Sequence, residues 1–230
     1  MHTNDSVNAS LLESLLAGAK FHKVNLGRVF KEAGQEPEML QEYDRIHLDH
    51  IGPLLRSLWL EMGDEASGFL SRPLKLGMFS MMCHALISSG NLRKGLLRSA
   101  RFIELLSDDL SLELKETGDE AHFIIHYKNP HDLDATFFVT SLFVIWIRLS
   151  CWLIDQPIML ERIQFKFPRP VYSDEFTLMF PCRHSFSQSV NSVVFNRRLL
   201  SLPIKQDTET EEPHFNSSQV TQHNKVNSCR

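Results

Sequence analysis

Several signatures of common enzyme sites are missing from this chain of 230 residues. Glycine occurs only ten times and the glycines do not cluster, so the sequence has neither a phosphate-binding loop nor the glycine fingerprint of a dinucleotide site. No G-x-S-x-G turn presents a serine nucleophile, and the plentiful Ser, His and Asp residues show no spacing typical of a catalytic triad. These absences predict that the protein is not an enzyme.

Cysteine is also scarce. The chain has four cysteines and no C-x-x-C pair, and Cys83 and Cys151 lie within apolar runs, where a free thiol behaves as a small hydrophobic residue. This usage is typical of a reducing compartment, so we expect a cytoplasmic protein without disulfide bonds.

The eleven histidines raise the question of a metal site. His47 and His50 have the spacing of one helix face, and His122 and His126 that of one strand face. Neither pair has a convincing second pair of ligand residues nearby, as a zinc site would require. Ordinary surface or half-buried histidines explain the pattern, and we expect no metal and no other cofactor.

Positive charge is in short supply, with a formal net charge of −4 at pH 7. Affinity for nucleic acid rests largely on Lys and Arg side chains that neutralise phosphates, so the sequence does not favour direct DNA binding. Residues 205–230 are mostly polar, and their cations are Lys205, Lys225 and Arg230. We expect one domain over residues 1–204, followed over 205–230 by a disordered tail or a truncated linker.

The spacing of apolar residues divides the folded part into two halves. Helical periodicity dominates up to about residue 107, and Asn91 is placed to cap the helix that follows the stop at 88–90. Alternation with period two then predicts a hairpin over 110–128 and further strands over 161–167, 175–180 and 191–195. The fold class is therefore α+β, a helical N-terminal half packed on a mostly antiparallel β-sheet, with one buried apolar helix (about 134–154) between strands.

The helix that begins after Asn91 has a basic side. Lys94, Arg98 and Arg101 fall opposite its apolar side at about 100° per residue. This side could contact phosphates, but a solvated face opposite a buried one explains it as well, and we favour the solvated face.

The apolar run over 135–154 approaches the length of a membrane-spanning helix. It contains Arg148 together with several threonines and serines, which is typical of a helix at the centre of a globular domain rather than of one in lipid. We therefore expect no membrane partner.

A narrow polar stripe interrupts this apolar helix. Ser141, Arg148 and Asp155 recur at a spacing of seven residues and so share one side. A buried arginine is costly unless it is paired, so Arg148 either meets an internal acid or faces a cavity that receives an anionic or carbonyl-bearing ligand. Because Trp146 and Trp152 lie on the same helix, a small-molecule pocket could form here, but for Arg148 we favour the structural ion pair.

Several short motifs, in order over about residues 10–204, carry a resemblance to a known family. The upstream segment EMGDEASGFLSRP and the segment LGMFSMMCHALISSGNLRKGLLRSARFIELLSDDL carry the first half of the pattern. The second half of the pattern is the order and spacing of eight residues in the last part of the predicted domain: Tyr172, Phe176, Cys182, Phe186, Asn191, Phe195, Leu199 and Pro203. Together these segments resemble the N-terminal, arabinose-binding-like sensor domain of AraC-type bacterial transcription regulators. Pro181 precedes Cys182 where the family pattern has a proline after the cysteine, and Arg183 and His184 replace the usual Pro-Val.

The resemblance implies a bacterial, cytoplasmic regulator. Residues 1–204 would then be an effector-sensing and dimerisation domain that forms a homodimer and binds a small-molecule effector of unknown identity. DNA would be bound only through a C-terminal helix-turn-helix domain, which we expect to be absent from this chain.

The ligand-binding residues predicted for this domain come from two helical segments. They are Phe79, His84, Trp146, Arg148 and Trp152. One alternative is a stand-alone truncated regulator that heterodimerises with full-length relatives and inhibits them, and another is a small-molecule enzyme on the same scaffold.

Overall fold

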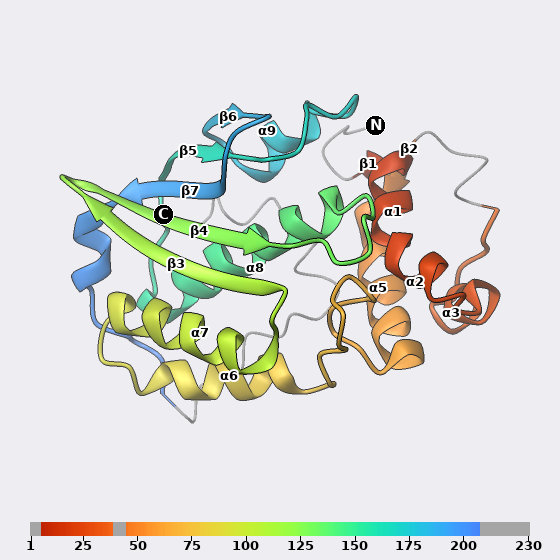
Figure 1. The fold of residues 1–230 in the computed structure, drawn as a ribbon, viewed down its shortest axis with the longest axis horizontal. Helices are drawn as coiled ribbons and strands as arrows, with labels where there is room; N and C mark the ends of the chain where they lie inside the picture. The colour runs from red at the N-terminus through yellow and green to blue at the C-terminus, as the bar shows by residue number, and fades with distance from the viewer. Residues whose placement is uncertain (1–5, 39–44, 208–230) are drawn as a thin grey trace.

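The computed structural model describes residues 6–38 and 45–207 of the chain. Within them, helices form one end and one side of the molecule and a sheet forms the rest (Figure 1). The tail or linker predicted over 205–230 lies outside the described residues except for 205–207.

The helical half agrees with the helical periodicity of the sequence up to about residue 107. Its helices are α1 (Ala9–Leu15), α2 (Ala17–Phe21), α3 (Leu26–Glu32), α5 (Leu48–Met62), α6 (Met78–Ile87) and α7 (Leu92–Leu106). Asn91 caps α7 as expected, because its side chain accepts a hydrogen bond of 3.0 Å from the amide of Lys94. Gly63, with φ of 60°, ends α5 in the left-handed conformation that glycine adopts without a steric penalty.

The first helices are held together by a short ribbon that the sequence did not indicate. Strand β1 (Ser6–Asn8) pairs antiparallel with β2 (Arg45–His47). The Arg45 guanidinium bonds the Ser6 carbonyl and also pairs with Glu175 at 2.6 Å, so it ties the N-terminal helices to a distant part of the chain. Strands of three residues give too little alternation to be recognised from the sequence.

The main sheet has the order β3-β4-β7-β5-β6. Its strands are β3 (Leu110–Thr117), β4 (Glu120–Tyr127), β5 (Leu160–Gln164), β6 (Arg183–Ser185) and β7 (Asn191–Asn196). The predicted hairpin is β3 and β4, which pair antiparallel with Leu112 opposite Ile125. The pairing of β5 with β6 is parallel, and the other pairings in this sheet are antiparallel. The α+β class is confirmed.

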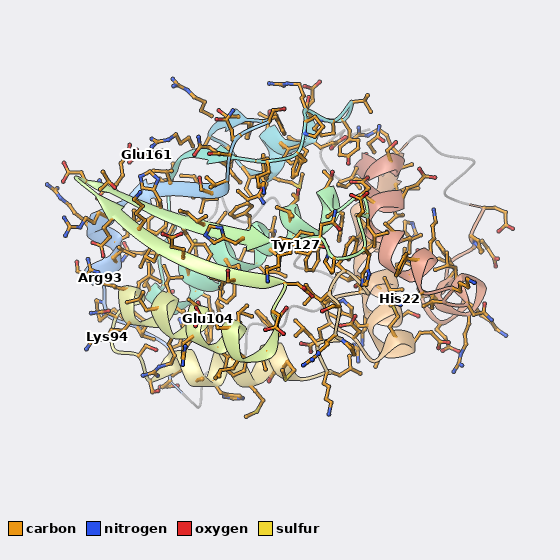
Figure 2. The ribbon with its side chains drawn as sticks, in the orientation of Figure 1. His22, Arg93, Lys94, Glu104, Tyr127 and Glu161 are labelled. Carbon is orange, nitrogen blue, oxygen red and sulfur yellow. The ribbon has the colours of Figure 1, made fainter. Side chains whose placement is uncertain are left out.

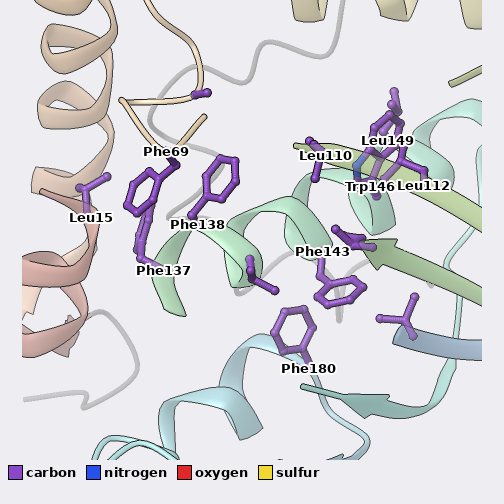
Figure 3. Packing of buried hydrophobic residues seen from close by; sticks show 14 of the residues in the cluster. Leu15, Phe69, Leu110, Leu112, Phe137, Phe138, Phe143, Trp146, Leu149 and Phe180 are labelled. Carbon is purple, nitrogen blue, oxygen red and sulfur yellow. The ribbon is translucent and has the colours of Figure 1, made fainter. Parts of the chain in front are cut away.

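The long apolar helix is α8 (Thr136–Ile154), and it forms the centre of the core. It is long and apolar enough to cross a membrane, but 56% of its apolar window is buried within the molecule. Trp146 on α8 packs against Phe123 of β4, with ring centroids 5.8 Å apart, and Phe143 packs against Phe165 at 5.9 Å. Figure 3 shows Phe143 and Trp146 among the buried side chains of the core. The helix therefore packs against the sheet on one side, as predicted for a helix at the centre of the domain.

One predicted strand is wrong. Residues 175–180 were expected to alternate as a strand, but Glu175–Met179 form the short helix α9. Phe176 and Phe180 are almost fully buried, whereas Leu178 is 44% exposed. Burial at i and i+4 but not at i+2 is the pattern of a helix, and the aromatic cluster that receives the two rings decides it.

The basic side of α7 makes local contacts. Arg98 donates to the Ala85 carbonyl at 2.7 Å and to Ser88, and Arg101 pairs with Glu104 at 3.0 Å. Figure 2 shows Arg93 and Lys94 at the end of α7 that lies nearest the β3–β4 turn. These contacts fit the solvated face favoured for this helix.

Candidate functional site

A cavity of about 360 Å³ lies where α8 meets the helical half. Its wall is built from α1, α5, α6, α7 and α8, with the loop over 65–74 and the first residue of β3 closing it. This volume falls in the range of pockets that bind small molecules. The site therefore lies between layers that are far apart in the chain.

Most of the wall is apolar. Side chains such as Leu55, Phe102, Phe138 and Ile145 make up the greater part of it. The polar or charged lining residues are Glu65, Ser67, Ser80, Thr140, Ser141 and Arg148. A mostly apolar wall with a few polar groups is the usual composition of a small-molecule site.

Helix α8 places the predicted polar stripe at the cavity. Ser141 and Arg148 line the wall, and they are two turns apart on the same side of the helix. Burial lowers the pKa of the Arg148 guanidinium from its ordinary value, because desolvation disfavours the charged form. Arginine nevertheless keeps its charge in proteins, so a partly desolvated positive charge stands in the wall. Asp155, the third member of the predicted stripe, ends the helix in the left-handed conformation and is not among the lining residues.

The loop after α5 supplies an acidic residue of the cavity wall, and hydrogen bonds between carboxylates and backbone amides hold this loop in place. The buried Asp64 carboxylate accepts hydrogen bonds from the amides of Ala66, Gly68 and Leu74, all between 2.7 and 2.8 Å. Next to it, the two oxygens of Glu65 accept from the amides of Gly77 at 2.7 Å and Phe79 at 2.9 Å. A carboxylate at this place stabilises the N-terminus of α6.

Trp146 lines the inner part of the cavity and carries an unsatisfied donor. Its side chain is 3% exposed, and its indole Nε1 is buried without a hydrogen-bond partner. In Figure 3 the nitrogen lies on the side of the ring nearer Leu110, another lining residue. A buried unpaired donor costs about 1–3 kcal/mol, so an acceptor atom within the cavity would recover free energy here.

The structure brings together three of the five predicted site residues. Phe79, Trp146 and Arg148 line the cavity. His84 is exposed on α6, and Trp152 is half-buried near the end of α8; neither is among the lining residues. His84 lies on α6 with Phe79, and Trp152 lies on α8 with Trp146 and Arg148, but His84 and Trp152 are not part of the cavity wall.

Sequence reasoning missed Glu65 and most of the apolar wall. Glu65 lies 12 residues before Gly77, outside the spacing by which a capping residue is recognised just before a helix. Its contact with the start of α6 exists only once the loop between them is folded. The apolar lining residues have the same periodicity as core residues, so only their placement around an unfilled volume distinguishes them.

Neither histidine pair gathers further metal-ligating side chains in the described part of the chain. His47 caps α5 and its ring lies 6.4 Å from that of His50, whereas His126 pairs with Glu113 at 2.9 Å. Over residues 6–38 and 45–207, no group of three or more His, Cys, Asp or Glu side chains is placed to hold a metal ion.

Comparison with known proteins gives the chain a family. Residues 24–204 match the model of the arabinose-binding domain of AraC transcription regulators, N-terminal. The ornithine utilization regulator of Pseudomonas aeruginosa is 23% identical over 188 residues, which are 81% of this chain and 56% of that protein. The chain thus spans about half the length of this curated relative.

A solved structure gives a weaker likeness. The crystal structure of the transcriptional regulator CdpR from Pseudomonas aeruginosa superposes with a TM-score of 0.41 and 14% identity, covering 57% of this chain and 43% of that one. The family model matches well over half of the chain and agrees with the motifs seen in the sequence. The protein therefore belongs to the family of N-terminal arabinose-binding domains of AraC transcription regulators.

Proposed function

We propose that the described domain senses a small-molecule effector in the cavity beside α8 and passes the signal to DNA binding. The observation that carries the proposal is a cavity of about 360 Å³, mostly apolar but with Arg148 in its wall, inside a domain of a regulator family. Such a volume, enclosed by several helices, is of a size to hold a metabolite.

The coupling would act through the elements that surround the cavity. Helices α5, α6, α7 and α8 each contribute to the wall, so a bound molecule would contact all of them at once. A ligand that prefers one arrangement of these helices shifts the population toward it. In the proposal, this shift changes how the domain associates into a homodimer and how an attached helix-turn-helix domain binds DNA. The regulator would act in the cytoplasm.

The first test is a thermal-shift screen of the chain against a library of bacterial metabolites. A ligand that binds only the folded state raises its stability by about 2.7 kcal/mol at a hundred times Kd, so the melting temperature rises measurably. We expect at least one chemical class to do so. The dimer fraction, measured by analytical ultracentrifugation, is expected to change with the same compounds.

A variant that fills the cavity locates the binding. Ser141 lines the wall from α8, and Ser141→Trp is expected to abolish the thermal shift while circular dichroism keeps its helical signal. The matched control is Ser201→Trp, at an exposed position in the short 3₁₀ helix Arg197–Ser201, which is expected to leave the shift unchanged. A screen without any stabilising compound, or a shift that survives Ser141→Trp, would contradict the proposal.

A further inference from the structure

The indole of Trp146 indicates which class of molecule the cavity takes, and this inference rests on the proposed sensing function. Trp146 lies on α8, lines the cavity and is 3% exposed. Its indole Nε1 is buried, and no group of the described residues accepts a hydrogen bond from it. The large majority of buried polar atoms in folded proteins have a partner, so this donor indicates that a ligand supplies the acceptor.

The second tryptophan of the cavity wall differs in this respect. Trp59 of α5 also lines the cavity, and its indole Nε1 donates to the Ser67 hydroxyl at 3.0 Å. The third tryptophan of the chain, Trp152, is half-buried and is not among the lining residues. The unpartnered N–H is therefore a property of one position in the wall.

The ring of Trp146 is held by its neighbours. It packs against Phe123 of β4, with ring centroids 5.8 Å apart and an angle of 58° between the ring planes. Figure 3 shows its nitrogen on the side of the ring nearer Leu110, which begins β3 and lines the cavity. A ring packed in this way has little freedom to rotate, so the fold sets the direction of the N–H before a ligand binds.

The wall on that side of the ring is apolar. Helix α7 and β3 line the cavity with Phe102, Ile103, Leu106 and Leu110. A ligand hydroxyl that accepted from Trp146 would have to place its own proton among these side chains, none of which accepts a hydrogen bond. A carboxylate would bring a net charge into the same surroundings, which costs more. The acceptor that fits is therefore neutral and has no proton of its own.

We propose that the effector is a neutral, largely apolar carbonyl compound, such as a ketone or an ester, whose carbonyl oxygen accepts a hydrogen bond from the Trp146 indole. A carbonyl oxygen has lone pairs and no proton, so this bond satisfies the donor and leaves no ligand proton unpaired. The apolar body of the ligand lies against the apolar side chains that make up most of the wall. A ligand of the same shape without the oxygen would leave the buried N–H unsatisfied and bind more weakly.

The test compares ligands of nearly one shape that differ in the group offered to Trp146, by isothermal titration calorimetry on the full chain. The aromatic set is acetophenone, 1-phenylethanol and α-methylstyrene. The aliphatic set is 2-octanone, 2-octanol and 2-methyl-1-octene. In each set a hydroxyl group or a terminal methylene group replaces the ketone oxygen. At least one ketone is expected to bind ten-fold or more tightly than its alkene, and also more tightly than its alcohol.

The indole N–H itself reports the bond. Each of the three tryptophans gives one indole signal in the ¹H–¹⁵N spectrum of the chain, and substitution of each by Phe assigns the signals. On addition of 2-octanone, which has no ring current, the Trp146 proton is expected to move downfield because a new hydrogen bond deshields it. The Trp59 proton, already bonded to Ser67, is expected to move less.

Variants assign the preference to Trp146. Trp146→Phe keeps an aromatic ring and removes the donor, and it is expected to reduce the preference for the ketone over its alkene to less than three-fold. Trp152→Phe, on the same helix but outside the cavity wall, is the matched control and is expected to keep the full preference. If Trp146→Phe does not fold, the ligand comparison and the indole signal of the unaltered chain still decide, with Trp59→Phe and Trp152→Phe assigning the signals by elimination.

The outcomes separate this inference from the proposed function. Equal binding of ketone and alkene overturns the inference, as does a preference that survives Trp146→Phe, and an alcohol that binds as tightly as its ketone shows that the acceptor need not be free of protons. Failure of both ketones to bind also overturns it. The sensing function then stands if any compound of the metabolite screen binds, and it fails as well if none does.

Discussion

At the scale of single residues, one carboxylate links three elements beside the β3–β4 turn. Glu116 on β3 accepts two hydrogen bonds from Arg93 of α7, at 2.7 and 2.9 Å, and another from Arg197, the first residue of the 3₁₀ helix after β7. Hydrogen bonds from Arg93 and then Arg197 lower the pKa of Glu116 to about 2. The sequence places these residues on different elements and gives no sign that they meet.

This pairing predicts a pH-dependent stability. A carboxylate whose pKa is lower in the folded state stabilises the fold above its unfolded pKa, near 4.5, and loses that contribution as the pH falls toward 2. Glu116→Gln is therefore expected to lower the melting temperature at pH 7 and to matter progressively less between pH 4.5 and pH 2. The effect at pH 7 should be on the order of 1 kcal/mol, because the arginines are partly solvated.

The control for this measurement is Glu104→Gln. Glu104 pairs with Arg101 on the exposed side of α7 within one helix turn, so its removal should change the melting temperature by less than Glu116→Gln at pH 7. A destabilisation by Glu116→Gln that is equal at pH 7 and pH 2.5 would show that the ion pairs are not its cause.

At the scale of elements, α9 shows how packing overrides a local pattern. Phe176, Leu178 and Phe180 alternate as they would on one face of a strand. The segment instead forms one helical turn, and Phe176 packs against Phe165 at 5.1 Å and Phe186 at 5.5 Å. Short apolar runs do not distinguish strand from helix, and here the rings that directly follow β5 and β6 decide the conformation.

The helical geometry of α9 gives a matched pair of substitutions. Phe176→Ala is expected to lower the free energy of unfolding by about 3–5 kcal/mol, because it empties a fully buried site. Leu178→Ala should cost about 1 kcal/mol or less, because Leu178 is 44% exposed. Urea unfolding followed by circular dichroism measures both. Similar losses at the two positions would favour the strand that the sequence predicted.

A second pair concerns the packing of α2 on the loop after α5. A Cβ added to Gly18 would lie 2.1 Å from the carbonyl oxygen of Ser67, a backbone atom that has little freedom to move. Gly18→Ala is expected to destabilise the fold by about 2–3 kcal/mol. At Gly95, in α7, the nearest atoms would lie 3.9 Å away.

Gly95→Ala is the control, and it should raise stability by up to about 1 kcal/mol, since alanine favours the helix and fits the space. Thermal unfolding of the two variants measures the difference. If Gly18→Ala were as stable as the unaltered chain, the close approach of α2 to the loop would be wrong.

At the scale of the whole molecule, the candidate site arises from the way the layers meet. The cavity receives side chains from segments as far apart in the chain as Val7 in β1 and Met179 in α9, and none of these segments encloses a volume by itself. The chain also makes contacts beyond residue 204, where the predicted domain ends. The amide of Lys205 donates a hydrogen bond to the Leu153 carbonyl at 2.7 Å, and the side chain of Gln206 donates one to the Trp152 carbonyl at 2.6 Å. These contacts hold the segment after Ile204 against the end of α8.

The sequence by itself determined the α+β class, the long helices, the β3–β4 hairpin and the family. These features rest on periodicity over many residues or on local signals such as the Asn91 cap, and such signals are independent of distant partners. The sequence also identified Arg148 as a residue of interest, because burying a charge within a long apolar helix costs free energy unless the charge is paired.

Only the tertiary structure decided which side chains surround the cavity. Apolar residues that line a cavity obey the same spacing as those that fill a core, so Phe102 and Ile145 could not be recognised in advance. The helix at α9, the ribbon of β1 and β2, and the arginine pairs of Glu116 likewise depend on contacts between residues far apart in the chain. Their stability comes from packing and pairing that exist only after the chain has folded.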